Sequence, residues 1–577
     1  MNEFKYSGKW KISNKDYSGD LFIVREKGII RLVLTYKWDG GIFIEDENIP
    51  NKIEYINGTL NTEAKMTLIN CKVIKRNSNF SYMKNTIVLD AEYCINGLNF
   101  SDFEDIKFFK IEFRISKTLS WSCLNGFKYL NGSTRKTPIK MRYSFNKSMK
   151  YDLDDGFKLE ILPCLAPMSY NCELENINLG QYIKFRFFNK KEKKLEEFID
   201  LLNKIKALIE IGIREHVDII KVEAYNKKIF SIYTDAKEKE HKQFYPIEIF
   251  LNQKIESKYE EPDKTDMLFE LKDITKQSIE EWYRKIQKLK PIIELYIETI
   301  EYEGMSLERK FLNIVQALET YHMRFICNEK KDFKLRVDNV YKKNKISEYI
   351  YDKEQEETPY ILIKNRMLDL FFSSNILWRF DPMIKFVYFT NSTINSRHYY
   401  THYSESKKYK ALNGIELEEA YYILRELLEN YILKELGIDN EKISKKLQNL
   451  LNIIKRNVEV FKNIEIDNEV AKKFDLNTSL YNISNNICYD YGLGEVKENS
   501  FIDDTDDTLN YVLRTKLDEN YIVKIFNKNK KDEDCLKYIE EETNDFKLCK
   551  SRSGEKLYRL QYFAENYRIC VYKKIKG

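Results

Sequence analysis

The sequence predicts a multidomain α+β protein. Three observations predict this: apolar and polar residues alternate with period two in the first part, apolar residues recur at helical spacing further on, and the tail returns to short strand-like runs. A length of 577 residues agrees with several domains, at roughly 150 residues each. The expected parts are a β-rich N-terminal domain (1–188), a mixed α/β middle region (189–303), an all-α helical bundle (304–462) and a small α+β C-terminal appendage (470–577).

The N-terminal domain reads as antiparallel strands. Residues 109–115 alternate apolar and charged side chains without a break, which predicts one apolar and one charged face, and residues 183–187 repeat the pattern. Apolar runs at 21–24 and 29–34 flank residues 26–28, as in a short hairpin. We therefore expect an antiparallel sandwich or an open barrel, a fold that alone implies no activity.

Amphipathic helices follow. Residues 193–211 and 276–302 are expected to be helical in the middle region, and a helix from about residue 307 continues the pattern in the bundle. The helix expected over 415–436 carries glutamates in its first turn and a lysine in its last, and Gly437 follows it. These placements suit the helix dipole and a glycine cap.

Composition limits the classes of function. The 96 Lys and Arg nearly balance the 91 Asp and Glu, leaving +5, so a nucleic-acid site must be a local patch. The N-terminus lacks the apolar run of a signal peptide, and no run of about 18 apolar residues is present. We expect a cytoplasmic protein without membrane contact. The ten Cys form no C-x-x-C pair, and we expect neither metal nor cofactor.

Residues 395–403, which follow a helical stretch expected from residue 381 to about 391, hold the strongest chemical signal. Two of the five histidines lie here, and Arg397 with His402 forms the one Arg-x4-His spacing in the chain. Between residues 381 and 412, five Lys or Arg face two Asp or Glu, a local charge of +3. A cationic patch around a histidine is what an RNA-phosphate site requires. The lysines that follow the motif are RNA-binding candidates: Lys407, Lys408 and Lys410.

These residues resemble a known family. The segment Arg-His-Tyr-Tyr-Thr-His-Tyr at 397–403, and the following helix that ends in Leu-Lys-Glu-Leu-Gly, resemble the HEPN ribonuclease domain of ApeA-type proteins. Residues 311–322 resemble the upstream helix of that domain. The resemblance covers about residues 1–460 and leaves the tail outside. This chain also resembles the β-rich domain that precedes HEPN in this family. The residues that carry this second resemblance are Trp10, 58–60 and 100–115.

The resemblance implies a metal-independent endoribonuclease in antiphage defence by abortive infection. It implies RNA, with tRNA as the target, a phage protein as trigger, and a homodimer formed through the HEPN domains. Attack of the 2′-OH would leave 2′,3′-cyclic phosphate and 5′-OH ends. His402 would transfer protons, because imidazole titrates near neutral pH. Arg397 would bind the phosphate, because the planar guanidinium matches it bidentately.

Several assignments stay open in the sequence. The family usually has Asn directly after the motif arginine, and here that residue is His398, which would orient substrate or simply pack. Glu319 projects near an apolar helix face, so it needs a partner; Arg397 or His402 is the candidate, and another basic residue is the alternative. His322 reads as a core histidine. The alternative function is a catalytically inactive HEPN scaffold that binds RNA or a phage trigger, and a third class is a carbohydrate- or peptide-binding β module.

Overall fold

The fold is taken from a computed structural model, which divides into two compact units, Met1–Tyr321 with Tyr421–Val458 and His322–Ala420 with Glu459–Gly577. Each unit is described by itself. The residues that the structure describes are 3–37, 49–79, 84–130, 140–167, 169–170, 177–234, 240–256, 259–302, 304–336, 360–374, 384–403, 408, 411–439, 441–443, 447, 496–503, 508–515, 520–527, 561–564 and 567–574.

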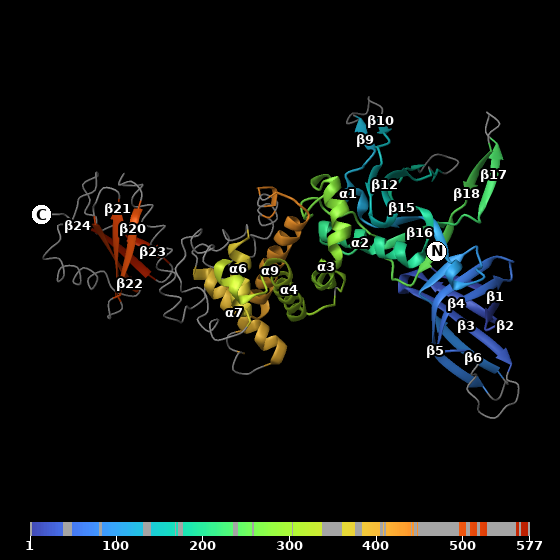
Figure 1. Ribbon diagram of the computed structural model, residues 1–577, viewed down its shortest axis with the longest axis horizontal. Helices are drawn as coiled ribbons and strands as arrows, with labels where there is room; N and C mark the ends of the chain where they lie inside the picture. Colours follow the sequence, from blue (N-terminus) through green and yellow to red (C-terminus); the bar gives the residue numbers. More distant parts are fainter. Residues whose placement is uncertain are drawn as a thin grey trace. The chain divides into compact units, whose positions relative to one another are not determined.

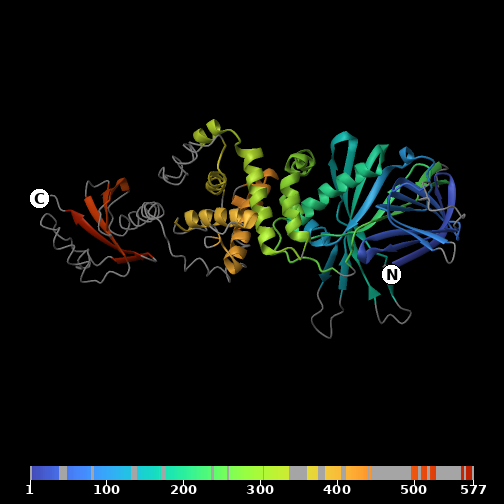
Figure 2. The ribbon, with the colours of Figure 1, turned by 90° about the horizontal axis from the view of Figure 1, so that it is seen from below.

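The chain begins with an antiparallel barrel (Figures 1 and 2). Six strands follow one another in the order β5-β4-β1-β2-β3-β6, and a further pairing of β5 with β6 closes the ring. The prediction of an antiparallel sandwich or open barrel is therefore confirmed in its barrel form, and the pairing of β5 with β6 closes that barrel. The strands are β1 (Glu3–Ile12), β2 (Lys15–Val24), β3 (Ile29–Lys37), β4 (Lys52–Leu60), β5 (Lys65–Asn79) and β6 (Lys84–Asp90).

The barrel is filled by apolar side chains around Trp10, which is completely buried. The Trp10 indole donates to the carbonyl of Gly19 over 3.2 Å, so its one polar group is satisfied. Gly58 of β4 lies opposite Trp10, and a Cβ at that glycine would lie 2.4 Å from the indole ring. Glycine is therefore required at residue 58 by close packing.

The same sheet continues beyond the barrel for seven strands in the order β7-β19-β16-β8-β15-β12-β11. Two of them, β16 and β19, come from the middle region, and β15 runs across residue 188. One sheet thus spans the boundary predicted at that residue. The strands are β7 (Tyr93–Asn96), β8 (Lys107–Ile115), β11 (Met149–Asp152), β12 (Phe157–Leu165), β15 (Gln181–Lys194), β16 (Ile219–Tyr225) and β19 (Ile247–Leu251).

The charged face predicted for residues 109–115 is a buried ion cluster. Ile111 and Phe113 face the core, whereas the Glu112 carboxylate on the other face accepts from Lys184 over 2.7 Å and from Arg186 over 2.6 Å. Burial alone would raise the pKa of Glu112, but these cations outweigh burial and lower the pKa to about 2. Phe109 departs from the prediction. It is only half-buried and packs on Phe244, outside the core face.

Three hairpins and a short helix complete the sheet region. The β9–β10 and β17–β18 hairpins stand off the sheet (Figure 1). Their bounds are α1 (Thr118–Ser122), β9 (Phe127–Leu130) with β10 (Lys140–Tyr143), β13 (Ser169–Tyr170) with β14 (Ile177–Asn178), and β17 (Phe230–Thr234) with β18 (Glu240–Phe244).

The helices of the first unit form a layer beside this sheet. The indole of Trp282 in α3 donates to the Lys204 carbonyl of α2 over 2.9 Å, and Tyr321 at the end of α4 donates to Glu435 of α9 over 2.9 Å. The predicted apolar stripe of α9 is buried, and Glu429 on another side of this helix is buried too. These helices are α2 (Leu195–Ile213), α3 (Lys276–Glu301), α4 (Leu307–Tyr321) and α9 (Gly414–Glu435), whose residues from Tyr421 onward belong to this unit.

The second unit contains the rest of the helical region and a five-stranded antiparallel sheet of order β20-β21-β22-β24-β23. None of the described helices is both long enough and apolar enough to cross a membrane. The elements are a π-helical turn (His322–Ile326), α6 (Ile363–Phe372), α7 (Ile384–His402), β20 (Val496–Asp503), β21 (Thr508–Thr515), β22 (Asn520–Asn527), β23 (Gln561–Ala564) and β24 (Tyr567–Lys574).

Candidate active site

The Arg-x4-His motif lies in the last turns of α7. The sequence predicted a helix that ends near residue 391 with the motif after it, but α7 continues to His402. Hydroxyl side chains support this stretch: Ser396 donates to the Ser392 carbonyl over 2.6 Å, and Thr401 donates to the Arg397 carbonyl over 2.7 Å. Bonds to the carbonyl four residues back let such polar residues remain in a helix.

The helix sets how the motif residues face. Arg397 and His398 are half-buried, and His402 is exposed. At 3.6 residues per turn, His398 and His402 lie about 40° apart around the axis, whereas Arg397 and His402 lie about 140° apart. The two histidines therefore share one face of α7, and the arginine projects from another.

A clamp holds the segment after α7 against the motif. The Leu412 amide donates to the Ser396 hydroxyl over 2.8 Å, and the Tyr400 hydroxyl donates to the Leu412 carbonyl over 2.6 Å. Ser396 and Tyr400 are four residues apart, so they lie on one face and together bind both backbone groups of Leu412. The clamp returns the chain to α7 just before α9 begins. Sequence reasoning missed it, although the Ser-x3-Tyr spacing inside the motif was a signal.

The lysine candidates lie in the segment that this clamp closes. Lys408 is exposed, whereas Lys407 and Lys410 lie outside the described residues. Rings gather at the same helix end: Tyr399 makes edge contacts with Tyr400 at 5.1 Å and with Tyr403 at 5.7 Å between centroids. Tyr403 is 68% exposed. An exposed ring next to a histidine and an arginine offers a stacking surface for a nucleobase.

His322 is a core histidine, as its helix face predicted. It is fully buried, its Nε2 lies 2.8 Å from the Asp369 carboxylate, and Arg366 approaches its Nδ1 over 3.1 Å. Because arginine can only donate, Nδ1 must accept and the proton sits on Nε2. Burial lowers the pKa of His322, and the positive charges of Arg366 and Arg336 lower it further. Arg336 closes the cluster by donating to Asp369 over 2.7 Å.

Glu319 lies on α4, half-buried, in the first unit. The motif residues lie on α7 in the second unit. Its expected pairing with Arg397 or His402 therefore stays a prediction.

Among the described residues, one group has the donor types of a metal site: Glu210, His216 and Glu301. Cations already fill the space between these carboxylates. Lys206 Nζ lies 2.6 Å from Glu210 and 2.7 Å from Glu301. Both ring nitrogens of His216 face carboxylates, Nδ1 at 2.9 Å from Glu210 and Nε2 at 3.3 Å from Asp218. These contacts raise the pKa of His216 to about 11, so the group is an ion-pair cluster. The expected lack of a metal stays a prediction.

Two family models match the chain, each over a different stretch. Residues 5–282 match the family model described as ApeA N-terminal domain 1. Residues 312–442 match the model described as Apea-like HEPN, a stretch that includes α7 and the Arg-x4-His motif. No curated protein and no solved structure matches the chain.

Proposed function

Because the chain belongs to the ApeA-like HEPN proteins, whose HEPN domains are generally ribonucleases of antiphage defence, we propose that it is a metal-independent endoribonuclease. Its substrate is RNA, with tRNA as the expected target, and a phage protein is its trigger. The observation that carries the proposal is the position of Arg397 and His402 at the accessible end of α7, with His402 exposed to substrate.

The chemistry needs two kinds of group. RNA carries its own nucleophile, so a catalyst must take the 2′-OH proton, stabilise the dianionic phosphorane and protonate the leaving 5′-oxygen. His402 supplies an imidazole, a group that can both accept and donate a proton. Arg397 supplies a permanent charge with parallel N–H donors for two phosphate oxygens. The products are a 2′,3′-cyclic phosphate and a 5′-OH.

One motif supplies one exposed histidine, whereas the reaction has two proton transfers. HEPN domains commonly dimerise, and a two-fold pairing of α7 ends would bring a second His402 and a second Arg397 into one cleft. The angle of about 140° between Arg397 and His402 on one helix favours the same arrangement. Each active centre would then combine the arginine of one protomer with the histidine of its partner.

The N-terminal region is assigned to control. An unrestrained tRNase would poison its host, so the 13-stranded sheet region would hold the nuclease inactive until the phage trigger binds. The resulting tRNA loss would stop the infected cell and with it the phage, which is abortive infection.

The test is cleavage of total tRNA in EDTA, with and without phage-infected lysate, followed by end-group analysis. We expect wild type to produce cyclic-phosphate ends and His402→Ala to lose activity by about 10²- to 10⁴-fold, the usual contribution of a general acid or base. Thr401→Ala is the matched control, because Thr401 is exposed in the same helical turn and bonds only the Arg397 carbonyl. No cleavage by wild type, or equal cleavage by His402→Ala, would contradict the proposal.

The second candidate function is a catalytically inactive HEPN scaffold that binds RNA or the trigger. His398 favours it, because it stands where the family usually has Asn and shares a helix face with His402. His398→Asn separates the two functions. A gain of cleavage from an inactive wild type would identify the scaffold, whereas an active wild type excludes it.

A further inference from the structure

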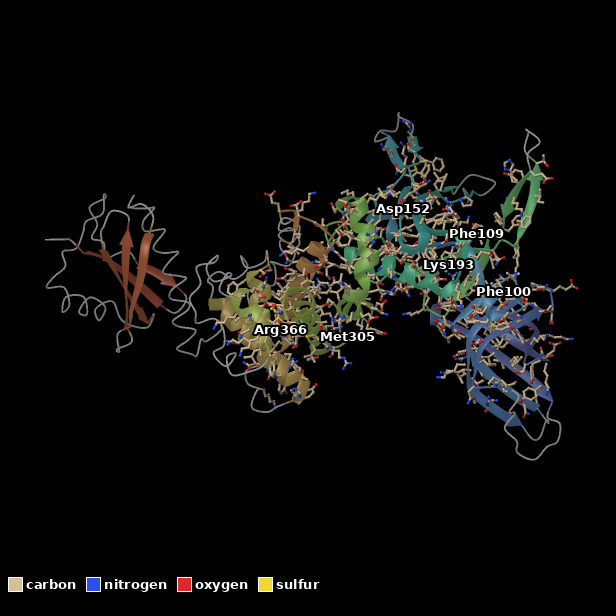
Figure 3. All side chains as sticks on the ribbon, in the orientation of Figure 1. Phe100, Phe109, Asp152, Lys193, Met305 and Arg366 are labelled. Carbon is tan, nitrogen blue, oxygen red and sulfur yellow. The ribbon has the colours of Figure 1, made fainter. Side chains whose placement is uncertain are left out.

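The β17–β18 hairpin of the first unit has no role in the proposed chemistry. It projects from the sheet (Figure 1), and its base is anchored by Phe244, whose ring packs on Phe109 at 4.9 Å and on Phe230 at 5.9 Å between centroids. Phe109 is labelled at this base in Figure 3. These ring contacts hold the base of the hairpin on strand β8.

One face of the hairpin displays aromatic rings. Tyr233 pairs with His241 across the two strands, and their rings stack at 5.5 Å with an interplanar angle of 28°. Ser231 and Tyr245 share a hydrogen bond of 2.8 Å on the same side. Tyr233 is 50% exposed and Tyr245 is 44% exposed. Exposed rings that are held in place by a cross-strand neighbour suit a partner with flat bases that can stack on them.

Lysines surround the base of this hairpin. The Lys227 amide donates to Glu192 over 3.1 Å and its ammonium to the Lys190 carbonyl over 3.4 Å, so the turn before β17 lies beside the bulged end of β15. Four exposed lysines gather there against one glutamate, Glu192, which leaves a local charge of +3. The lysines are Lys190, Lys191, Lys227 and Lys228.

The spacing matches a single-stranded polyanion. Three residue steps of β17 lead from Phe230, which follows the turn that holds Lys228, to Tyr233, or about 10 Å at the rise of an extended strand, which accommodates a nucleotide or two. Stacking requires unpaired bases, and the lysines require phosphates. An acidic protein would satisfy the lysines but would leave the rings without flat partners.

We propose that the β17–β18 hairpin, with the lysines at its base, is a docking site for single-stranded RNA segments. The proposal rests on the proposed function for its substrate class and adds a second RNA contact on the N-terminal region. Tyr233 and His241 stack on bases, and the lysines bind the backbone.

The experiment measures fluorescence anisotropy of a labelled oligouridylate, which lacks paired structure, with the full chain carrying His402→Ala so that RNA is not cut. Tyr233→Ala is expected to weaken binding about tenfold, the effect of one lost stack, whereas Tyr233→Phe keeps the ring and the affinity. Lys227→Glu with Lys228→Glu is expected to reduce the salt slope by about 1.4, at 0.7 per phosphate contact. The matched control is Lys9→Glu with Lys11→Glu, two exposed lysines of β1.

Equal binding by Tyr233→Ala and Tyr233→Phe, together with equal slopes for the two lysine pairs, would overturn the docking site. Binding of polyglutamate with the same affinity and the same dependence on Tyr233 would also overturn it, in favour of an acidic protein. Cleavage by wild type is scored separately. Ring-dependent binding without any cleavage supports docking and refutes only the nuclease, whereas cleavage with a KM unchanged by Tyr233→Ala refutes only docking.

Discussion

Replacing Glu429 by alanine removes the shared acceptor of two buried cations. The Glu429 carboxylate is completely buried and accepts two hydrogen bonds from the Arg214 guanidinium, whose side chain is 8% exposed. The Tyr296 hydroxyl donates to it over 2.7 Å, and Arg425 pairs with it at 3.5 Å. Removal of one partner from a buried pair costs about 3–5 kcal/mol, because the other charge stays buried without compensation. We expect Glu429→Ala to lower the free energy of unfolding by that amount.

The assay is urea denaturation followed by tryptophan fluorescence, since Trp282 is buried on α3, the helix that also carries Tyr296. Glu294→Ala is the control. Its pair with Lys290 is exposed and should contribute below about 1 kcal/mol. Arg214→Met combined with Glu429→Leu removes the closer of the two ion pairs and should recover part of the loss, since Arg425 still lacks its acceptor. A loss for Glu429→Ala no larger than that for Glu294→Ala would refute the reasoning.

Three further predictions follow from individual contacts. The pKa of Glu112 in the folded protein is about 2, below its ordinary 4.5. The stability that this carboxylate contributes is therefore complete above pH 4.5 and is lost as the pH falls towards 2. In urea titrations across this window, the free energy of unfolding should depend less on pH for Glu112→Gln than for wild type. Gly58→Ala should cost about 1–3 kcal/mol by overpacking the barrel, measured by thermal denaturation against Gly304→Ala, where a Cβ meets nothing within 4 Å. Tyr400→Phe removes one of the two hydrogen bonds of the clamp on Leu412 and should lower kcat for RNA with little change in melting temperature; an unchanged kcat would contradict the clamp's role.

The elements predicted best from sequence are those with unbroken periodicity. Residues 276–302 were expected as a helix and α3 runs Lys276–Glu301, because an amphipathic stripe is a local property. Barrel closure could not be read this way, since it also requires β3 to pair with β6, where Arg31 lies opposite Asp90, and partners so distant in sequence leave no mark on either strand. Phe109 shows the same limit. A register shift in β15 opposite β8 moves it off the predicted face.

The motif residues could be found from sequence because their spacing is local. The buried contacts elsewhere in the second unit could not be found in this way. His322 and Asp369 are 47 residues apart and both buried, and neither residue reveals the other. The end of α7 was placed too early for a related reason. Ser392, Ser396 and Thr401 are poor helix formers by propensity, and only the folded chain shows hydroxyls bonded to carbonyls four residues back.

Helix α9 carries Glu429 of the buried ion pair and begins just after the clamped segment. α9 begins two residues after Leu412, whose backbone the α7 hydroxyls hold. The same helix carries Glu429, which binds Arg214 at the end of α2, within the stretch that matches ApeA N-terminal domain 1. The Glu429–Arg214 pair therefore fixes the later turns of α9 against the end of α2 within the first unit, whereas the turns before Tyr421 belong to the second unit with the clamp.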